Sequence, residues 1–153
     1  MKNAKLIILR LGSGFFALIA LMTGARKLYV GASGELGDAA TSLAGSPALA
    51  SLDNDLRFLA MCWLSIGMAL MVGAIIPRRK PDFILIGLIV VILGGFARLY
   101  GFTEYGPLPD EYAPIAIEFF VGMPLLALFI SWRKEQGEAP LANEPSLEAT
   151  TGS

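Results

Sequence analysis

Three ionised side chains lie at the edges of, or inside, the most apolar segments of this sequence. Arg57 leads directly into an apolar run, in the segment DNDLRFLAMCWLSIGMALM, Arg98 ends a second run, and Glu118 lies within a third. A carboxylate removed from water must find a cation or take a proton. These side chains could therefore form a closed charged cluster or bind a polar ligand.

The other residue types exclude several kinds of active site. The sequence has no histidine, which removes the commonest general base and metal ligand. Its single cysteine, Cys62, can form neither an intrachain disulfide nor a redox pair. A carboxylate metal site is conceivable but lacks ordered spacing in the candidate ligands, Asp53, Asp55, Glu104, Asp110 and Glu111. We therefore expect no metal and no cofactor, and the absence of a basic stripe argues against a nucleic-acid partner.

The elements that carry these side chains are long apolar segments. Of the 153 residues, 55% are hydrophobic and 16% are charged, whereas soluble domains carry about 25% charged residues. A bilayer core about 30 Å thick requires roughly 20 apolar residues per helix. Segments that meet this requirement lie at about 5–25, 56–76, 82–102 and 113–132. The pattern predicts an all-α membrane protein, a bundle of four transmembrane helices.

The domain organisation follows from these spans. Residues 1–134 form the predicted transmembrane domain, and residues 26–55 form a long outer loop with room for a short surface helix. The segment 135–153 is rich in Pro, Gly, Ser and Glu and has few large apolar residues. That composition predicts a disordered cytoplasmic tail.

Lysine and arginine are unevenly distributed between the two sides of the predicted bundle. With the N-terminus in the cytoplasm, the inner side holds eight, Lys2, Lys5, Arg10, Arg78, Arg79, Lys80, Arg133 and Lys134. The outer side holds four, Arg26, Lys27, Arg57 and Arg98. Because cytoplasmic loops carry an excess of basic residues, we predict that both termini are cytoplasmic.

This orientation places the charged residues of all four spans at a similar depth. Lys27 follows the first span, Arg57 begins the second, Arg98 lies near the end of the third, and Glu118 lies about a turn and a half into the fourth. We predict one polar layer near the outer leaflet. It is either a clamp that fixes the register of the helices or a pocket that opens outward.

Three of these segments resemble a known family. NDLRFLAMCWLSIGM, GGFARLYGF and EFFVGMPLLALFISW are similar to segments of small four-helix bacterial inner-membrane proteins, a family known as a domain of unknown function and distantly similar to DoxX-type proteins. The resemblance covers roughly residues 6–133. It implies a multi-pass protein of the bacterial inner membrane and no particular reaction. The positions to test by this match are Asn54, Asp55, Arg57, Gly95, Arg98 and Glu118.

Three functions fit this sequence. The first is a non-enzymatic envelope protein whose polar pocket binds membrane lipid or another amphipathic ligand, or which supports a membrane complex as a homo-oligomer or with a membrane protein partner. The second is an oligomeric transporter or channel subunit coupled to protons or ions, in which Glu118 would be the coupling group. The third is a quinone-linked redox subunit or membrane enzyme, which the absence of histidine makes the weakest of the three.

Overall fold

The chain is helical over most of the residues that the computed structural model describes, 2–106 and 109–137. In chain order these are α1 (Lys2–Leu36), α2 (Ala39–Ser42), α3 (Pro47–Ile75), α4 (Pro81–Tyr105), the 3-10 turn η1 (Pro109–Glu111), α5 (Tyr112–Phe120) and α6 (Gly122–Gly137). Four helical stretches are long and apolar enough to cross a membrane: α1, α3, α4 and the pair α5–α6. The predicted all-α bundle of four transmembrane helices is confirmed.

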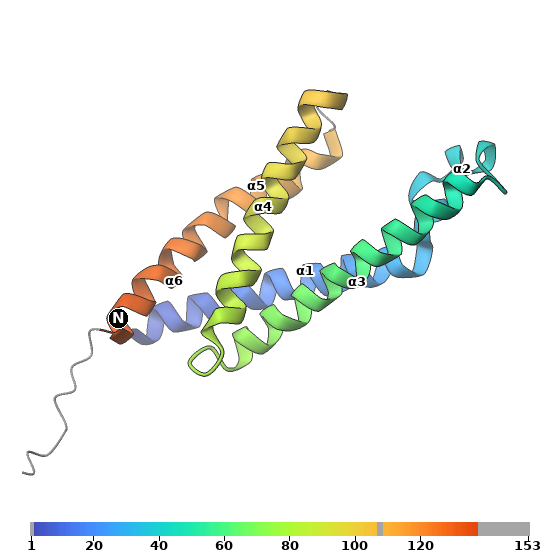
Figure 1. Cartoon of the computed structure of the whole chain (residues 1–153). Helices are drawn as coiled ribbons and strands as arrows, with labels where there is room; N and C mark the ends of the chain where they lie inside the picture. The colour runs from blue at the N-terminus through green and yellow to red at the C-terminus, as the bar shows by residue number, and fades with distance from the viewer. Residues whose placement is uncertain (1, 107–108, 138–153) are drawn as a thin grey trace, which may run out of the picture.

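The helices form two hairpins that meet at one end and diverge at the other (Figure 1). In one hairpin α1 lies alongside α3, and in the other α4 lies alongside α5 and α6. The N-terminal end of α1, the end of α6 and the turn between α3 and α4 lie together at what we call the closed end. The opposite end, where α2 and η1 lie apart, is the open end.

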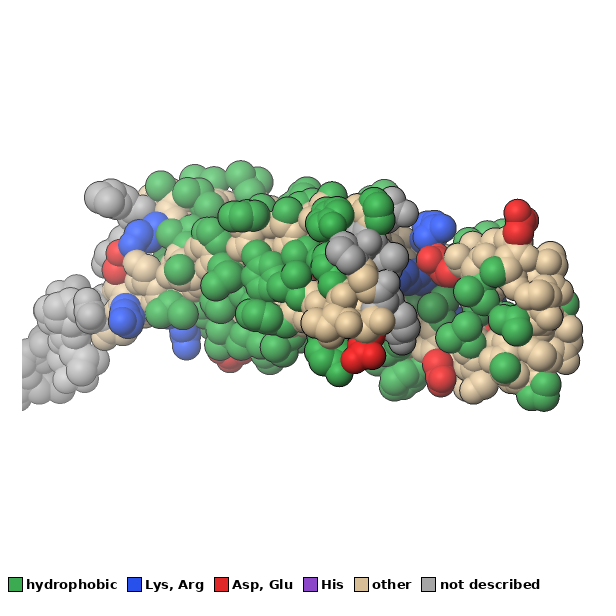
Figure 2. Space-filling view, turned by 90° about the horizontal axis from the view of Figure 1, so that it is seen from above, with side chains coloured by type: hydrophobic (Ala, Val, Ile, Leu, Met, Phe, Trp, Pro, Cys, Tyr) green, Lys and Arg blue, Asp and Glu red, His purple; other side chains and the backbone are tan. Residues whose placement is uncertain are grey.

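The apolar core lies in the region where the hairpins meet. Its buried side chains come from all four spans and are Leu9, Phe16, Ala17, Leu70, Ile84, Leu88, Val91, Leu125, Phe129 and Trp132. Figure 2 shows hydrophobic side chains over the middle of one face, with most charged side chains toward the two ends. This distribution is typical of a protein whose middle section faces lipid.

The segment 26–55, which the sequence predicted as an outer loop, is helical over most of its length. α1 continues to Leu36, and α3 begins at Pro47 with Ser46 as its N-cap, whose hydroxyl accepts a hydrogen bond from the Leu49 N–H at 3.2 Å. Serine before a proline at the first helical position is a strong start signal. At 35 and 29 residues, α1 and α3 are about 52 and 43 Å long, so this hairpin exceeds the bilayer core.

The fourth span is divided, and it ends later than the sequence predicted. α5 ends at Phe120 and α6 begins at Gly122. Pro124 has no N–H to donate to the Phe120 carbonyl, which explains an interruption at this position. α6 extends to Gly137, so the first residues of the predicted tail are helical. The remainder of that tail, 138–153, lies outside the described residues.

Basic side chains of α1 fix the closed end. Arg10 donates to the carbonyls of Ala74 (3.0 Å, from Nε) and Ile75 (2.7 Å, from Nη2), the last residues of α3. These carbonyls have no partner within the helix, and a cation there also interacts favourably with the negative end of the helix dipole. Lys5 donates to the Ser131 hydroxyl at 2.8 Å and forms an ion pair with Glu135 of α6. α1 is thereby tied to the ends of two other helices.

Glycines set the close approach of α1 and α3. A Cβ atom added to Gly67 would lie 3.0 to 3.1 Å from atoms of Ala20 and Leu21, including the Leu21 backbone nitrogen. A Cβ added to Gly14, on the same hairpin, would meet its nearest atom, the Ala74 Cβ, at 4.0 Å. Small residues of this kind allow helix backbones to pack closely in membranes.

We predict that Gly67→Ala lowers the free energy of unfolding by about 1–3 kcal/mol, because the added methyl group forces α1 and α3 apart. The measurement is reversible unfolding of the purified protein in mixed micelles. Gly14→Ala makes the same chemical change where space exists and should alter stability by less than about 1 kcal/mol. Equal losses from the two substitutions would contradict this account of the packing.

Candidate functional site

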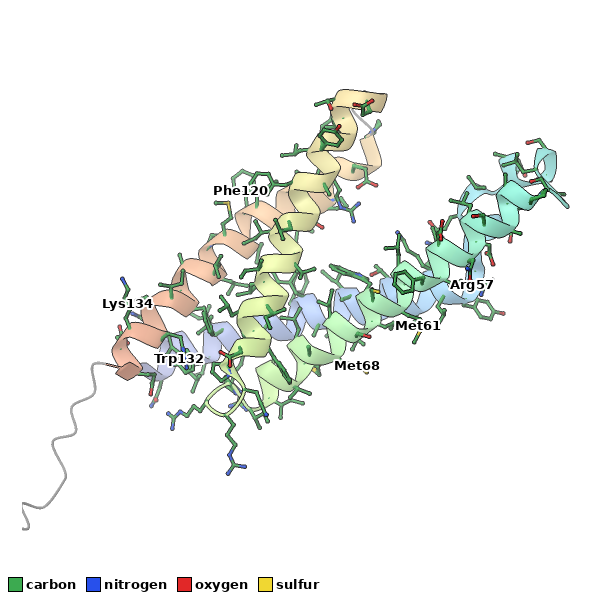
Figure 3. The ribbon with its side chains drawn as sticks, in the orientation of Figure 1. Arg57, Met61, Met68, Phe120, Trp132 and Lys134 are labelled. Atoms are coloured by element: carbon green, nitrogen blue, oxygen red, sulfur yellow. The ribbon has the colours of Figure 1, made fainter. Side chains whose placement is uncertain are left out.

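The structure divides the predicted polar layer into two clusters, one in each hairpin. Arg57 lies between α3 and α1, toward the open end, where the α1–α3 hairpin is separate from the tips of α4 and α5 (Figure 3). Arg98 and Glu118 lie together in the α4–α5 hairpin. Because the hairpins diverge, Arg57 is separated from Arg98 and Glu118, although their similar depth predicted a single layer.

The first cluster lies at an interruption of α1. Gly31 has φ 63° and ψ −165°, which is outside the helical region and bends α1. In a regular helix the Ala32 N–H would donate to the Leu28 carbonyl four residues earlier. Here the Ala32 N–H donates to Asp53 Oδ1 at 2.7 Å, and the Leu28 carbonyl accepts from Arg57 Nη1 at 2.5 Å. Two side chains of α3 thus replace one missing hydrogen bond of α1.

Asp53 and Arg57 are also bonded to each other. They stand four residues apart on α3, and Arg57 Nε donates to Asp53 Oδ2 at 2.7 Å. Residues at this spacing share a helix face. A Cβ added to Gly31 would lie 2.1 Å from Asp53 Oδ1 and 2.6 Å from Arg57 Nη2, so the bend requires glycine for space as well as for its φ angle. Together Gly31, Asp53 and Arg57 form what we call the kink clamp.

A pocket lies beside the kink clamp. It has a volume of about 340 Å³, and its lining combines polar and apolar residues from α1, the α2–α3 turn and α3: Ser33, Gly45, Ser46, Leu49, Ala50, Asp53 and Arg57. The Arg57 side chain is 43% exposed and that of Asp53 is 32% exposed, so both remain accessible from the pocket. The arrangement can bind a small polar group but contains no nucleophile paired with a base.

The second cluster joins α4 to η1 and α5. Arg98 Nε donates to Glu118 Oε1 at 3.3 Å, and Arg98 Nη1 donates to Glu111. The Glu118 side chain is only 10% exposed, and it packs against the backbone of Gly94 and Gly95. Its second oxygen, Oε2, is buried and finds no hydrogen-bond partner within residues 2–106 and 109–137. This cluster places two carboxylates around one guanidinium.

The remaining predicted site residues join neither cluster. Lys27, Asn54 and Asp55 are exposed and form no hydrogen bond or ion pair between side chains in the described part of the chain. The acidic partner of Arg57 is Asp53, which the sequence indicated only as a possible metal ligand, although its i,i+4 spacing to Arg57 was a usable signal. The sequence likewise indicated Glu111 only as a possible metal ligand, and it gave no indication of Gly31. Over residues 2–106 and 109–137, acidic and cysteine side chains gather nowhere in the groups of three that could hold a metal ion.

We predict that Asp53 and Arg57 are energetically coupled, because each satisfies a backbone group exposed by the bend and both satisfy each other. Asp53→Ala and Arg57→Ala should each lower the free energy of unfolding, because each leaves a backbone group of α1 without its partner. A double-mutant cycle in mixed micelles should show that the two losses are not additive. Asp55→Ala, on the exposed face of the same turn, serves as the control and should change stability by less than about 0.5 kcal/mol. Additive losses in the cycle would rule out the clamp.

Comparison with known proteins defines the family. Residues 8–131 match the family described as "Domain of unknown function (DUF4345)", which covers most of the chain and all four spans. Neither the curated proteins nor the solved structures contain a match to this chain. The similarity to DoxX-type proteins therefore stays a prediction. Because the family match covers most of the chain, this chain is a member of the DUF4345 family, and its four spans make it a multi-pass helical membrane protein.

Proposed function

We propose that this chain is a non-enzymatic protein of the bacterial inner membrane whose pocket beside the kink clamp binds the headgroup of a lipid or of another amphipathic molecule. The observation that carries the proposal is the pocket of about 340 Å³ beside Arg57, with charged, hydroxyl and apolar groups in one lining. Ligand sites of this kind combine an apolar wall with a few placed polar groups.

The position of the pocket along α3 supports a lipid ligand. The polar segment SLDND ends at Asp55, and the apolar run of α3 starts at Leu56. Arg57 therefore lies at the boundary of the hydrocarbon, and Ser46 lies about 16 Å further along the helix axis. Each interfacial region adds about 5–8 Å to the bilayer core. The part of the pocket nearest Arg57 would therefore lie at headgroup depth, and the part nearest Ser46 would extend beyond it into water.

The chemistry of the lining suits a headgroup that carries both a negative and a positive charge. The Arg57 guanidinium can bind a phosphate through two N–H groups, and the Asp53 carboxylate can accept from an ammonium. Because the two side chains neutralise each other, the lining has no strong preference for a purely anionic ligand. Leu49 and Ala50 add an apolar wall for the glycerol and the first methylene groups. A phosphoethanolamine headgroup meets these conditions.

The basic residues support an orientation with both termini in the cytoplasm. The closed end carries the turn with Arg78, Arg79 and Lys80 together with Lys5 and Lys134, near both ends of the helical domain. The positive-inside tendency places this end in the cytoplasm, and it places the kink clamp and the pocket at the outer leaflet.

We predict that the α2 segment is outside the cytoplasm. In a Cys62→Ser background, a cysteine introduced at Ala39 should react with a membrane-impermeant maleimide in intact spheroplasts, whereas one at Arg79 should react only after lysis. Both positions are exposed, so accessibility in the folded protein does not bias the comparison. The reverse labelling pattern would show that the orientation is opposite.

We also predict that filling the pocket displaces lipid. Ala50→Leu places a larger side chain in the lining and leaves Asp53 and Arg57 unsubstituted, and it should weaken retention of phosphatidylethanolamine about tenfold, or about 1.4 kcal/mol. Native mass spectrometry of protein released from phosphatidylethanolamine nanodiscs measures the bound fraction. Ala48→Leu is the matched control, since Ala48 is exposed on α3 outside the pocket lining. Equal lipid retention in the two variants would refute a headgroup site here.

A further inference from the structure

The cluster of Arg98, Glu111 and Glu118 has an excess of negative charge. Two carboxylates meet one guanidinium, and the sum for the ionised groups is −1. Among the described residues, the charged groups that face Glu118 are Arg98 from α4 and Glu111 from η1, while α6 begins there with Gly122 and Met123, which do not ionise. In this part of the chain, one of the two carboxylates therefore has no cation of its own.

Glu118 is the carboxylate whose negative charge Arg98 does not fully neutralise. Arg98 also binds Glu111, and its bond to Glu118 is long, with 3.3 Å between Arg98 Nε and Glu118 Oε1. Glu118 Oε2 has less than 1 Å² of accessible surface and no hydrogen-bond partner among the described residues. Burying a charged oxygen without a hydrogen bond is costly, and a single long contact to Arg98 offsets little of that cost.

The space around Glu118 Oε2 admits a proton but no larger cation. A Cβ added to Gly95 would lie only 3.2 Å from this oxygen, so the backbone of α4 already packs against it. A metal ion with its oxygen ligands would require this contact to open. A proton requires no additional space and converts the unpartnered oxygen into a neutral hydroxyl.

We propose that Glu118 is a proton-binding site at the open end of the α4–α5 hairpin. An O–H bond forms at Oε2 with a proton taken from water, and Arg98 is then left to neutralise Glu111. When the proton returns to water, Arg98 is shared between two carboxylates. The link from α4 to α5 therefore changes strength with the protonation of one side chain, and this site is separate from the headgroup pocket in the other hairpin.

Infrared difference spectroscopy of the full chain in phosphatidylethanolamine nanodiscs tests this proposal. The wild type should show the C=O stretch of a protonated carboxylic acid, with an amplitude that titrates with pH. Glu118→Gln should abolish the band, whereas Glu104→Gln, which removes an exposed carboxylate of α4, should leave it. A band that persists in Glu118→Gln, or that is absent from the wild type at every pH at which its helical circular dichroism is retained, would overturn the proposal. A signal that follows sodium concentration and not pH would do the same.

A second pair of variants keeps the test valid if Glu118→Gln does not fold. A Cβ added to Gly94 would lie 3.6 Å from Glu118 Oε1, which is ordinary contact distance, so a serine there can donate a hydrogen bond to the carboxylate. Gly94→Ser should stabilise the ionised form and weaken the carboxylic acid band at a given pH. Gly94→Ala adds the same carbon without a donor and should leave the band at full strength. Identical bands from the two variants would count against a proton on Glu118.

Discussion

The bend at Gly31 leaves a backbone N–H and a backbone carbonyl of α1 without their usual helical partners, and the register of the α1–α3 hairpin depends on how they are paired. The kink clamp supplies a carboxylate for the N–H of Ala32 and a guanidinium for the carbonyl of Leu28. Because these two side chains come from α3, the bend in α1 can exist only where α3 lies beside it. The hydrogen bonds thus fix the register of the long hairpin at its open end.

Interrupted helices and ionised side chains occur together elsewhere in the chain. The fourth span breaks between α5 and α6, and Glu118 lies in the last turn of α5, just before this break. At the bend in α1, charged side chains of α3 replace a missing backbone hydrogen bond. In α5 the carboxylate contacts Arg98, and one of its oxygens finds no partner among the described residues. The two hairpins therefore use charge differently. The first holds a neutral pair that supports structure and lines a pocket, and the second holds a surplus carboxylate.

The closed and open ends also differ in how firmly the hairpins are joined. At the closed end Arg10 and Lys5 connect α1 with α3 and α6, and the aromatic rings of Phe129 and Trp132 lie in the common core. Toward the open end each hairpin is held by its own contacts, α1 with α3 and α4 with α5. Near the open end the Asp53 and Arg57 side chains are partly exposed, whereas Glu118 is buried within its own hairpin.

The sequence by itself determined the number of spans, the all-α fold and the residues that carry charge into the apolar segments, because hydrophobic length and the cost of burying charge are local properties. It also contained the i,i+4 spacing of Asp53 and Arg57, which predicts an ion pair on one face of a helix. The tertiary structure alone decided which charges meet. Depth along a helix is readable from residue number, but the partners of a charged side chain depend on which helices lie side by side. Arg57 bonds to the interrupted backbone of α1, whereas Arg98 and Glu118 bond to each other in a second hairpin that diverges from the first at the open end, so one predicted layer became a clamp with a pocket and a carboxylate cluster.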